Sequence, residues 1–475
     1  MGVTTTDYSL PPWSLREYQV GAVNFAHPRK GTMLLMGMRT GKTRSTCAAL
    51  DAWDSHRVIV VLPKAISDTV WREHVEEFMP RHTYIDLADG SPVKKRAAAL
   101  LTESKYGTGR LVAGINYGAF WRPAMLAALN ALPQFDLVFD EIHKLKTHDG
   151  KASEAAFKLA MRADHVLGLT GTVFPNSPLD GFGAYRPVDI GVFGRSFTRF
   201  KGAYANVVMV KLRTPRRGKY GKMITHFPEV VGFKNEKEMA RRMNTCTWRV
   251  DRSVLKLTPA THEVRHCSMP SKAMTMYRML ERGIALDVES GTVNPANALV
   301  RALRLQQLTG GMIVSDDGDA ERVHTAKRDE VVELLGSIPG EPFVIFYKFV
   351  ADKNAIFEAA RTAYPNDPVS QISGQGNDLR AWNAGEGGNV IAVQVGAGQE
   401  GIDLSRAAYC GFYSTGFSLG DYDQALARIH GGEQERPVGY FHFVVPGTID
   451  EAVSRALRAK GNVNKAVLTH IRKRR

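Results

Sequence analysis

The sequence predicts an α/β protein with two parallel-sheet domains in tandem and a mostly helical, basic segment between them. Three observations predict this fold class. Short apolar runs alternate with helical patterns in the first third of the chain, the alternation stops near residue 185, and it resumes near residue 342. Such alternation is typical of a parallel sheet that is covered on both faces. We expect domains at residues 1–185 and 326–475, with a connecting region at 186–325.

Apolar runs mark the strands of the N-terminal domain. Segments with apolar residues at helical spacing lie between these runs, at 68–78 and 151–163. A further strand is expected at TMLLMGM (32–38), directly before a predicted helix that begins at Thr43. The other strands are expected at VIVVLP (58–63), RLVAGIN (110–116), FDLVFDE (135–141) and HVLGLTGT (165–172).

The connecting region is more basic and richer in long helical patterns. We expect a glycine-containing basic loop at KLRTPRRGKYGK (211–222) and a helix at 297–312 that is closed by Gly310. The basic loop is a candidate DNA contact, and a solvated surface loop is an equally good interpretation, because exposed runs of charge are common. In the second sheet, strands are expected at PFVIFYKF (342–349), NVIAVQVG (389–396), YCGFYSTG (409–416) and GYFHFVVPG (439–447).

The composition favours a globular protein with a polyanionic partner. Hydrophobic residues make up 44% of the 475 residues, which is enough apolar material for sizeable cores. No apolar run reaches the roughly 18 residues of a transmembrane helix, and the four cysteines form no C-x-x-C pair. The net charge of +14 points to nucleic acid as the partner, although some proteins are simply basic.

The stretch GMRTGKTRS nearly spells a phosphate-binding loop. Gly41, Lys42 and Thr43 stand where the strict pattern needs them, but Met36 replaces its first glycine and Arg39 replaces a second glycine that many such loops carry. The Lys42 ammonium would neutralise the terminal phosphates of a nucleotide, and the Thr43 hydroxyl would bind Mg²⁺. We expect the loop to work because Gly41, Lys42 and Thr43 are intact, and it still closes if Arg39 keeps an ordinary conformation of negative φ.

Two carboxylates end the predicted strand LVFDEIH. Asp140, at the carboxyl end of a strand beside the phosphate loop, can hold Mg²⁺ through water. Glu141 can polarise an attacking water, and His143 can couple the site to neighbouring loops. A strand that merely ends in solvated acids is common, but it becomes the weaker interpretation once a G-K-T loop lies upstream.

These residues resemble motifs of the superfamily II helicases, and most closely those of the Swi/Snf-like translocases, including the compact versions common in bacteriophages. The resemblance covers nearly the whole chain, and the matched segments follow the family's order. In the first domain they are SLREYQ (14–19), GMRTGKT (37–43), VLPKAISDTVW (61–71), GINYGAF (114–120), DEIHKLKT (140–147) and LTGTVFPNSPLD (169–180). In the second they are VIFYKF (344–349), QISGQGNDLRAWN (371–383), VGAGQEGIDLS (395–405) and DYDQALARIHGGEQERPV (421–438).

The resemblance implies two RecA-like domains that hold ATP and Mg²⁺ between them and move along DNA, either a duplex or a junction. The implied catalytic residues are Lys42, Asp140, Glu141 and Arg428. The implied ATP contacts are Gln19, Gly41, Lys42, Thr43, Gly401, Asp403 and Gln424, with Mg²⁺ held by Thr43 and Asp140. The implied coupling residues are His143, Thr170 and Thr172, and the DNA-binding candidates are Pro63, Lys64, Asn116, Lys144 and Lys348.

The expected function is that of an ATP-dependent DNA helicase or translocase, a hydrolase that serves phage DNA replication, recombination or genome handling in the host cytoplasm. One departure from the family opens an alternative. A second arginine usually stands three residues after the first in the last motif, but Gly431 occupies that position. Because such arginines act on the transition state, the alternative is a catalytically weakened, ATP-gated DNA-binding protein. A P-loop kinase is a third interpretation, and it leaves the second sheet domain unexplained.

Overall fold

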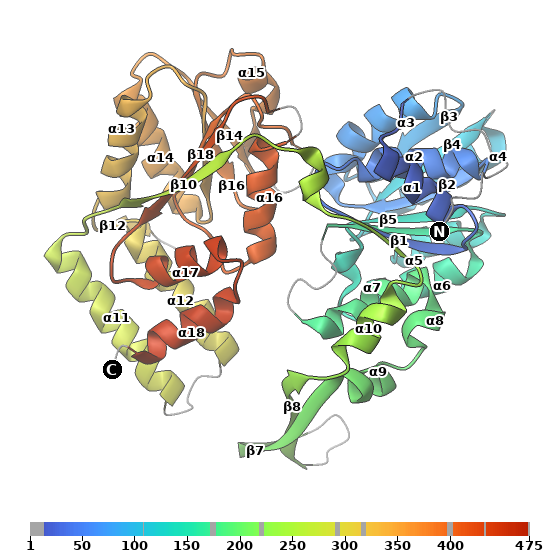
Figure 1. Cartoon of the computed structure of the whole chain (residues 1–475), viewed down its shortest axis with the longest axis horizontal. Coiled ribbons are helices and arrows are strands. Elements are labelled where there is room, and N and C mark those ends of the chain that lie inside the picture. The colour runs from blue at the N-terminus through green and yellow to red at the C-terminus, as the bar shows by residue number, and fades with distance from the viewer. Residues whose placement is uncertain are drawn as a thin grey trace. The chain divides into compact units, whose positions relative to one another are not determined.

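The computed structural model describes residues 14–107, 109–171, 177–217, 223–289, 295–314, 320–396, 402–431 and 434–473. The chain divides into two compact units, which are Met1–Val254 (unit 1) and Leu255–Arg475 (unit 2) (Figure 1). Residues 186–254 therefore belong to unit 1 and residues 255–325 to unit 2. A separate connecting region at 186–325 stays a prediction.

In the described part of unit 1, seven strands form one sheet in which every pair is parallel. The strands are buried along most of their length, which explains why their sequences are continuous apolar runs. Across the sheet they are β3 (His82–Asp86), β4 (Arg110–Asn116), β2 (Arg57–Leu62), β5 (Asp136–Asp140), β6 (Val166–Thr170), β1 (Gly31–Met36) and β9 (Thr247–Val250).

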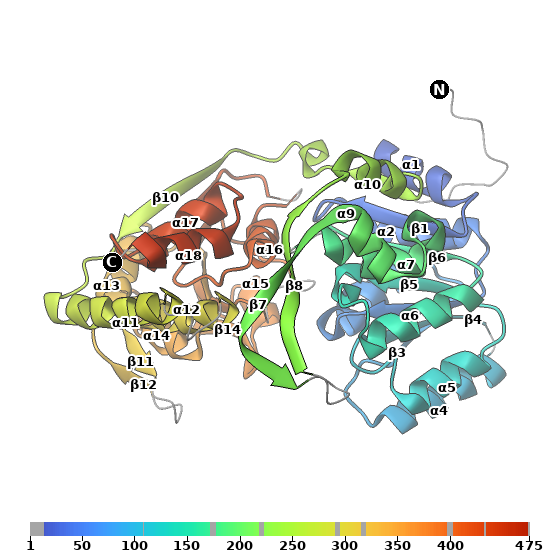
Figure 2. The same ribbon diagram turned by 90° about the horizontal axis from the view of Figure 1, so that it is seen from below.

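Helices cover both faces of this sheet (Figures 1 and 2). Side chains alternate along a strand, so Leu34 and Met36 of β1 pack into one core cluster while Met33 and Leu35 pack into the other. The first cluster includes residues of α1 (Glu17–Ala26), α2 (Lys42–Ala52) and α3 (Arg72–Phe78). The second includes residues of α4 (Val93–Tyr106), α5 (Pro123–Ala131), α6 (Lys151–Arg162) and α7 (Gly181–Val188).

A long β-ribbon replaces the loop that the sequence predicted at 211–222. The chain runs through α8 (Ile190–Phe193) and α9 (Phe197–Tyr204), and then through the antiparallel strands β7 (Ala205–Arg217) and β8 (Met223–Phe233). Helix α10 (Glu236–Met243) and the edge strand β9 follow. The loop prediction is wrong for residues 211–217, because pairing with β8 continues as far as Arg217↔Met223. Residues 218–222 lie outside the described residues.

In the described part of unit 2, seven strands form a second sheet, which is parallel except for the pair β14–β15. The strands, in order, are β10 (Ala260–His266), β18 (Val438–Val444), β17 (Tyr409–Phe412), β13 (Phe343–Tyr347), β16 (Val390–Gln394), β14 (Val369–Ser373) and β15 (Gly376–Asn377). One core cluster contains α13 (Ala326–Ser337) and α14 (Val350–Ala363). The other contains α11 (Ser271–Glu289), α12 (Pro295–Thr309), α15 (Leu379–Asn383), α16 (Leu419–Ile429), α17 (Ile449–Arg458) and α18 (Val463–Lys473). A short hairpin, β11 (Met312–Val314) and β12 (Ala320–Arg322), follows α12.

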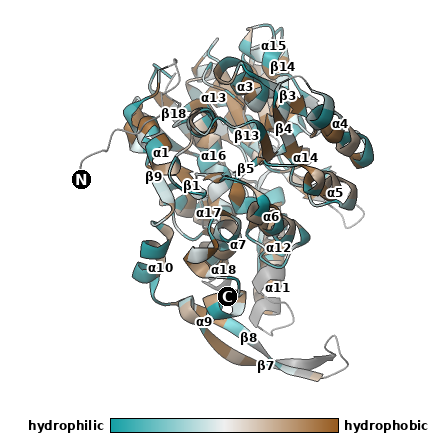
Figure 3. Ribbon diagram, turned by 90° about the vertical axis from the view of Figure 1, so that its right-hand side faces the viewer, coloured by the Kyte–Doolittle hydropathy of each residue, from teal (hydrophilic) through white to brown (hydrophobic). Residues whose placement is uncertain are grey.

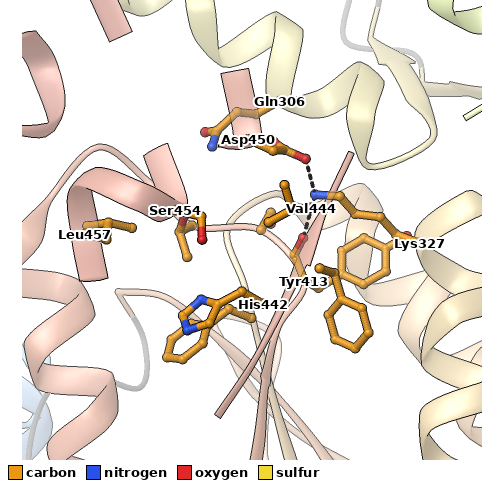
Figure 4. Close-up of a pocket in the computed structure, with 12 residues that line it drawn as sticks. Gln306, Lys327, Tyr413, His442, Val444, Asp450, Ser454 and Leu457 are labelled. Carbon is orange, nitrogen blue, oxygen red and sulfur yellow. Dashed lines mark hydrogen bonds and ion pairs between the residues drawn. The ribbon is translucent and has the colours of Figure 1, made fainter. Parts of the chain in front are cut away.

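A buried ion pair ties the helices of unit 2 to its sheet (Figure 4). The Lys327 ammonium lies 2.7 Å from a carboxylate oxygen of Asp450 and donates to the carbonyl oxygen of Tyr413 at 2.9 Å. The Thr309 hydroxyl donates to the other carboxylate oxygen of Asp450 at 2.9 Å. Because a buried charge is costly unless it is paired and hydrogen-bonded, these contacts fix α12, α13 and α17 against β17.

The cavity beside this ion pair is too small for a nucleotide. It has a volume of about 20 Å³ and is lined by Gln306, His442, Ser454 and the residues of the ion pair. A space of this size holds about one water molecule. The cavity therefore belongs to the polar core of unit 2 and is not a substrate site.

The predicted fold class is confirmed. The eight strands expected after residue 57 are β2, β4, β5, β6, β13, β16, β17 and β18, and the helices expected at 151–163 and 297–312 are α6 and α12. The edge strands β9 and β10 were not predicted, because their sequences TWRV and ATHEVRH are more polar than those of the central strands. Among the described residues, no helix combines the length and the apolar character that crossing a membrane requires.

Candidate active site

Three neighbouring strands of unit 1 bring the predicted site residues to one edge of the sheet. Strand β6 pairs with both β5 and β1, and all three run in the same direction. Their carboxyl ends carry Thr170, Asp140 with Glu141, and the loop between β1 and α2. Ligands of open parallel sheets bind at the carboxyl ends of the strands. Thr170, Asp140, Glu141 and the loop before Lys42 therefore lie at the edge of the sheet where ligands of such folds bind.

The phosphate-binding loop closes through its own hydrogen bonds. The Thr40 hydroxyl donates to the carbonyl oxygen of Gly37 at 2.7 Å, and the Gly37 N–H donates to the carbonyl oxygen of Val250 in β9 at 2.9 Å. The condition of a negative φ at Arg39 is not met, because Arg39 has φ 62°. The loop turns here through the left-handed region, which glycine adopts without strain. This explains why many such loops carry glycine at this position.

Glycine is the one residue type that fits at position 41. Its φ is 84°, and a Cβ atom there would lie 2.2 Å from Nε2 of Gln19. The Gln19 side chain is buried, donates from Nε2 to the carbonyl oxygen of Thr40 at 3.1 Å, and accepts from the Arg16 N–H at 2.9 Å. Gln19 thus ties the start of α1 to the loop, and its contact with an adenine base stays a prediction.

Replacing Arg39 by glycine is expected to stabilise unit 1 relative to replacing it by alanine. Both changes remove the same side chain, but only glycine relieves the left-handed backbone, which costs about 1–2 kcal/mol for other residues. We expect the glycine variant to be about 1 kcal/mol more stable than the alanine variant in urea unfolding. Equal unfolding midpoints for the two variants would show that the backbone at residue 39 carries no strain.

Lys42 lies where a lysine of a phosphate-binding loop is needed. It is the first residue of α2, and its ammonium lies 3.2 Å from the carbonyl oxygen of Met36 and 3.5 Å from that of Gly37. The Lys42 charge also lowers the pKa of Asp140, so the two side chains act on each other electrostatically. Thr43, the next residue of α2, is partly buried at the same helix N-terminus.

Asp140 is a buried carboxylate held by two donors. The Trp71 indole N–H donates to one carboxylate oxygen at 2.9 Å, and the Glu141 backbone N–H donates to the other at 3.0 Å. Burial, followed by the neighbouring Glu141 carboxylate, raises the pKa of Asp140 to about 6. The Tyr117 hydroxyl donates to the backbone carbonyl of Asp140 at 2.8 Å. Sequence reasoning missed Trp71 and Tyr117, which lie far from Asp140 along the chain.

Glu141, His143 and Thr170 form a short polar chain across the ends of β5 and β6. A carboxylate oxygen of Glu141 lies 3.2 Å from Nδ1 of His143, and the same nitrogen lies 3.1 Å from the Thr170 hydroxyl. Glu141 has φ 53°, another left-handed residue of the kind that gathers at functional sites. The coupling role that the resemblance implied for His143 and Thr170 stays a prediction. Thr172 lies outside the described residues.

As the pH rises from about 4 to about 6, the unfolding free energy of the metal-free protein is expected to fall because Asp140 loses its proton. Its folded-state pKa, about 6, lies above the value of about 4 in an unfolded chain, so the folded state binds the proton more tightly. Asp140→Asn removes this pH dependence. Relative to wild type, we expect the variant to gain about 2–3 kcal/mol in unfolding free energy between pH 4 and pH 7.

Urea unfolding followed by tryptophan fluorescence reports this effect, since five of the six tryptophans lie in unit 1. The exposed Asp149, changed to Asn, serves as the control for the loss of a surface carboxylate. A constant difference between Asp140→Asn and wild type from pH 4 to pH 7 would contradict the raised pKa.

The residues at this edge fit a Mg²⁺ ion that a nucleotide brings with it. Within the residues that the structure describes, no group of three or more His, Cys, Asp or Glu side chains could hold a metal. One carboxylate and one hydroxyl, from Asp140 and Thr43, suffice for Mg²⁺ when phosphates and waters supply the other ligands. The Asp140 carboxylate is therefore suited to a phosphate-bound metal and not to a resident one.

Three of the DNA-binding candidates lie along the same edge of the unit 1 sheet. Pro63 and Lys64 follow β2, and Asn116 ends the neighbouring parallel strand β4. Pro63 is buried and Lys64 is exposed, whereas Asn116 accepts a hydrogen bond from the buried Arg96 at 3.1 Å. Lys144, four residues after Asp140, is exposed. These positions leave Lys64 and Lys144 accessible to a partner.

Unit 2 carries the other predicted residues in two places. Asp403 accepts from the backbone N–H and the hydroxyl of Ser405, at 3.1 and 3.0 Å. Gln424 and Arg428 lie one turn apart on α16, and the Arg428 carbonyl accepts from the Leu404 N–H at 3.0 Å, so α16 adjoins the segment of Asp403. Lys348 follows β13, where its N–H donates to the Ser414 hydroxyl at 2.8 Å. Gly401 lies outside the described residues.

Arg436 does not stand in for the arginine that is missing at Gly431. Its guanidinium lies 2.8 Å from a carboxylate oxygen of Glu341 and donates to the Arg406 carbonyl at 3.0 Å. Arg436 precedes β18 and Glu341 precedes β13, so this pair lies at the amino ends of the strands. Gly431 itself is buried, two residues after α16 ends.

No protein-family model matches the chain. The chain is 24% identical over 480 residues to "Putative protein p41" of Acyrthosiphon pisum secondary endosymbiont phage 1, with 97% of this chain and 99% of that protein covered. Two solved structures from Sulfolobus solfataricus are similar to it. The SWI2/SNF2 ATPase core in complex with dsDNA is 18% identical, with a TM-score of 0.42 over 98% of this chain and 95% of that one. The SWI2/SNF2 ATPase core domain is 19% identical, with a TM-score of 0.42 over 97% and 92%.

Proposed function

We propose that this protein is an ATP-dependent DNA translocase or helicase, a hydrolase whose ATP turnover is stimulated by DNA. One observation carries the proposal: a buried carboxylate, Asp140, lies within the electrostatic reach of the loop lysine Lys42, at the carboxyl ends of parallel strands. A lysine at a helix N-terminus binds phosphate, and a carboxylate beside it binds the accompanying magnesium ion. The pair is the minimum set for gripping a nucleoside triphosphate.

Each residue of unit 1 has a distinct task in this proposal. Lys42 and the N–H groups at the start of α2 hold the β- and γ-phosphates, and Thr43 and Asp140 hold the metal. The bound Mg²⁺ would neutralise charge that develops on the transferred phosphoryl group. Glu141 orients the attacking water and accepts its proton. His143 and Thr170 transmit the state of this site to the segment that follows β6.

Unit 2 is proposed to complete the site with Arg428. Its guanidinium would contact the γ-phosphoryl group and stabilise the charge of the transition state, while Gln424, one turn away, contacts the nucleotide. Asp403, on the segment that adjoins α16, senses the nucleotide together with Arg428. Closure of the two units around ATP and their opening after hydrolysis would then produce movement.

DNA is the proposed track. The net charge of +14 and the exposed Lys64 and Lys144 at the carboxyl edge of unit 1 suit a phosphate backbone. Backbone contacts are largely independent of sequence, so we expect binding to duplexes or junctions that weakens steeply with salt. The likeness to a phage protein over 97% of the chain supports a phage origin. We propose that the activity serves phage replication, recombination or genome handling in the host cytoplasm.

An ATP-gated DNA-binding protein is the second candidate, and Gly431 favours it. The engagement of Arg436 with Glu341 leaves Arg428 as the arginine proposed to act on the phosphoryl group. The two candidates share the same sites and differ only in turnover.

Steady-state ATP hydrolysis with and without duplex DNA separates the candidates. The proposed translocase hydrolyses ATP faster when duplex DNA is added, and single-stranded DNA, forked DNA and RNA define its preferred track. A P-loop kinase would show no stimulation by any of these. If the protein binds ATP and DNA but hydrolyses no ATP under any condition, the translocase proposal is wrong and the ATP-gated DNA-binding protein is the remaining candidate.

A further inference from the structure

Most of the excess positive charge of the chain is concentrated in one segment of unit 1. Residues 195–242, called here the ribbon module, contain 13 Lys and Arg against 3 Asp and Glu, a surplus of 10 out of the net +14. The module consists of α9, the β7–β8 ribbon and α10. The residues to which the proposed function assigns ATP or DNA lie outside this module, although the sequence marked 211–222 as a candidate DNA contact. The charge of this segment is therefore unexplained by the proposed site.

Near its base, the ribbon is open to solvent on both faces. Val207 and Val208 point to opposite faces of β7, and their exposed fractions are 40% and 44%. Met209 and Val231 are exposed as well. Figure 1 shows β7 and β8 leaving unit 1 beside α9, and Figure 3 shows the hydrophobic start of β7 (brown) and the hydrophilic α10 (teal). A two-stranded ribbon gains little stability by itself, so its exposed length serves something other than the core.

The base of the ribbon is held firmly. Tyr204, the last residue of α9, is buried, and its backbone carbonyl accepts from the Lys234 N–H at 3.0 Å, which joins the two ends of the ribbon. The Asn235 amide donates to the Ala203 carbonyl at 2.8 Å, and the Tyr204 hydroxyl donates to Glu238 of α10. The Phe200 ring packs on Tyr204 with centroids 5.1 Å apart. The ribbon is thus a projecting arm on a fixed base.

Basic residues lie both along the arm and around its base. Strand β7 carries Lys211, Arg213, Arg216 and Arg217, and the register sets Lys211 opposite His226 and Arg217 opposite Met223. Around the base, exposed basic side chains belong to Arg195, Arg199, Lys234, Lys237 and Arg241. One acidic residue of the base, Glu238, is engaged, since it pairs with Arg242. The backbone of β7 therefore carries basic residues along the arm, and exposed basic side chains surround its base.

We propose that the ribbon module is a second DNA contact, which grips duplex DNA independently of ATP. This inference rests on the proposed function for the identity of the nucleic acid. The major groove of B-form DNA admits a two-stranded β-ribbon, and the phosphates that border the groove complement the basic residues of β7 and of the base. The arm holds the duplex while the sheet edge at Lys64 releases and rebinds it. The ribbon therefore determines the affinity for DNA, and the nucleotide site determines movement along DNA.

Neutralising the arm tests the proposal. The arm variant changes Lys211, Arg213, Arg216 and Arg217 to Gln, and the control variant changes four exposed lysines outside the module, Lys30, Lys105, Lys158 and Lys272, to Gln. Fluorescence anisotropy of a labelled 30-base-pair duplex gives the dissociation constant between 50 and 200 mM KCl, with and without a non-hydrolysable ATP analogue. We expect the arm variant to bind about 10–100-fold more weakly than wild type. We also expect a slope of log K against log [KCl] that is shallower by about 2–4.

The outcomes separate this inference from the proposed function. The control variant should bind within about threefold of wild type, and the arm variant should keep wild-type ATP turnover at saturating DNA. An arm variant with the wild-type dissociation constant and slope, in a protein whose ATP turnover DNA stimulates, overturns the ribbon contact alone. Wild-type protein that neither binds duplex DNA nor responds to it overturns both proposals. A charge-reversed variant, with Lys211, Arg213, Arg216 and Arg217 all changed to Glu, must bind more weakly than the neutral arm variant, and failure to do so also counts against the contact.

Discussion

Replacing Arg428 by alanine is expected to lower DNA-stimulated ATP turnover by about 10³–10⁵-fold, the range measured for arginines that stabilise the phosphoryl-transfer transition state. Gly431 removes the second arginine of this motif, and Arg436 is held by Glu341 and the Arg406 carbonyl. In the proposed mechanism, the whole contribution of unit 2 to the transition state therefore falls on the Arg428 guanidinium. ATP affinity should change far less, because the interaction is made chiefly in the transition state.

Two further variants sharpen this test. Arg428→Lys keeps the charge but not the planar guanidinium, so it should recover little of the lost rate. Arg436→Ala removes an arginine of the same region and should leave turnover within about threefold of wild type, since its partners lie at the amino ends of the strands. Turnover is measured at saturating ATP and duplex DNA. An Arg428→Ala variant with wild-type turnover, or an Arg436→Ala variant as slow as Arg428→Ala, would contradict the assignment.

Glu141→Gln is expected to lower turnover by about 10²–10⁴-fold and to leave ATP binding nearly unchanged. Glutamine has the same shape as glutamate and tolerates the same backbone, but it cannot accept the proton of the attacking water. The short contact with Nδ1 of His143, 3.2 Å away, places the Glu141 carboxylate in the polar chain that ends at Thr170. In this variant the turnover of ATP should therefore fall while the affinity for ATP stays nearly the same.

Pre-steady-state mixing with labelled ATP measures the two quantities on one sample. The matched control is Glu76→Gln, which removes an exposed carboxylate on α3 and should behave as wild type. If Glu141→Gln weakens ATP binding as strongly as it slows turnover, then Glu141 supports the structure of the site and is not the catalytic base.

The central strands and the phosphate loop could be predicted because their signals are local. A strand buried on both faces must be apolar at every position, as in VIVVLP, and G-K-T before a helix sets the loop and Lys42 at once. The ribbon was wrongly predicted as a loop because its strand pairing depends on residues outside the segment. The charges and glycines of 211–222 suggest a loop, while the pairing that makes β7 a strand involves residues of β8.

The partners of Asp140 show the limit of local reasoning within the site. Trp71 looks like a packing residue in the sequence, and nothing in DTVWREH indicates that its indole N–H points to a carboxylate 69 positions away. Sheet order creates this contact, since β2, which precedes Trp71, pairs directly with β5, which ends at Asp140. The left-handed backbone of Arg39 could not be predicted either. It follows from the closure of the loop by the hydrogen bond between Thr40 and Gly37.

A structure of the protein with Mg²⁺, ADP, aluminium fluoride and a DNA duplex tests the central claim most directly. The account predicts that the Lys42 ammonium and the Arg428 guanidinium both lie within hydrogen-bonding distance of the fluoride ligands that mimic the transferred phosphoryl group. A complex in which Lys42 contacts this mimic while Arg428 remains elsewhere would contradict it, and so would one in which the mimic binds away from Lys42.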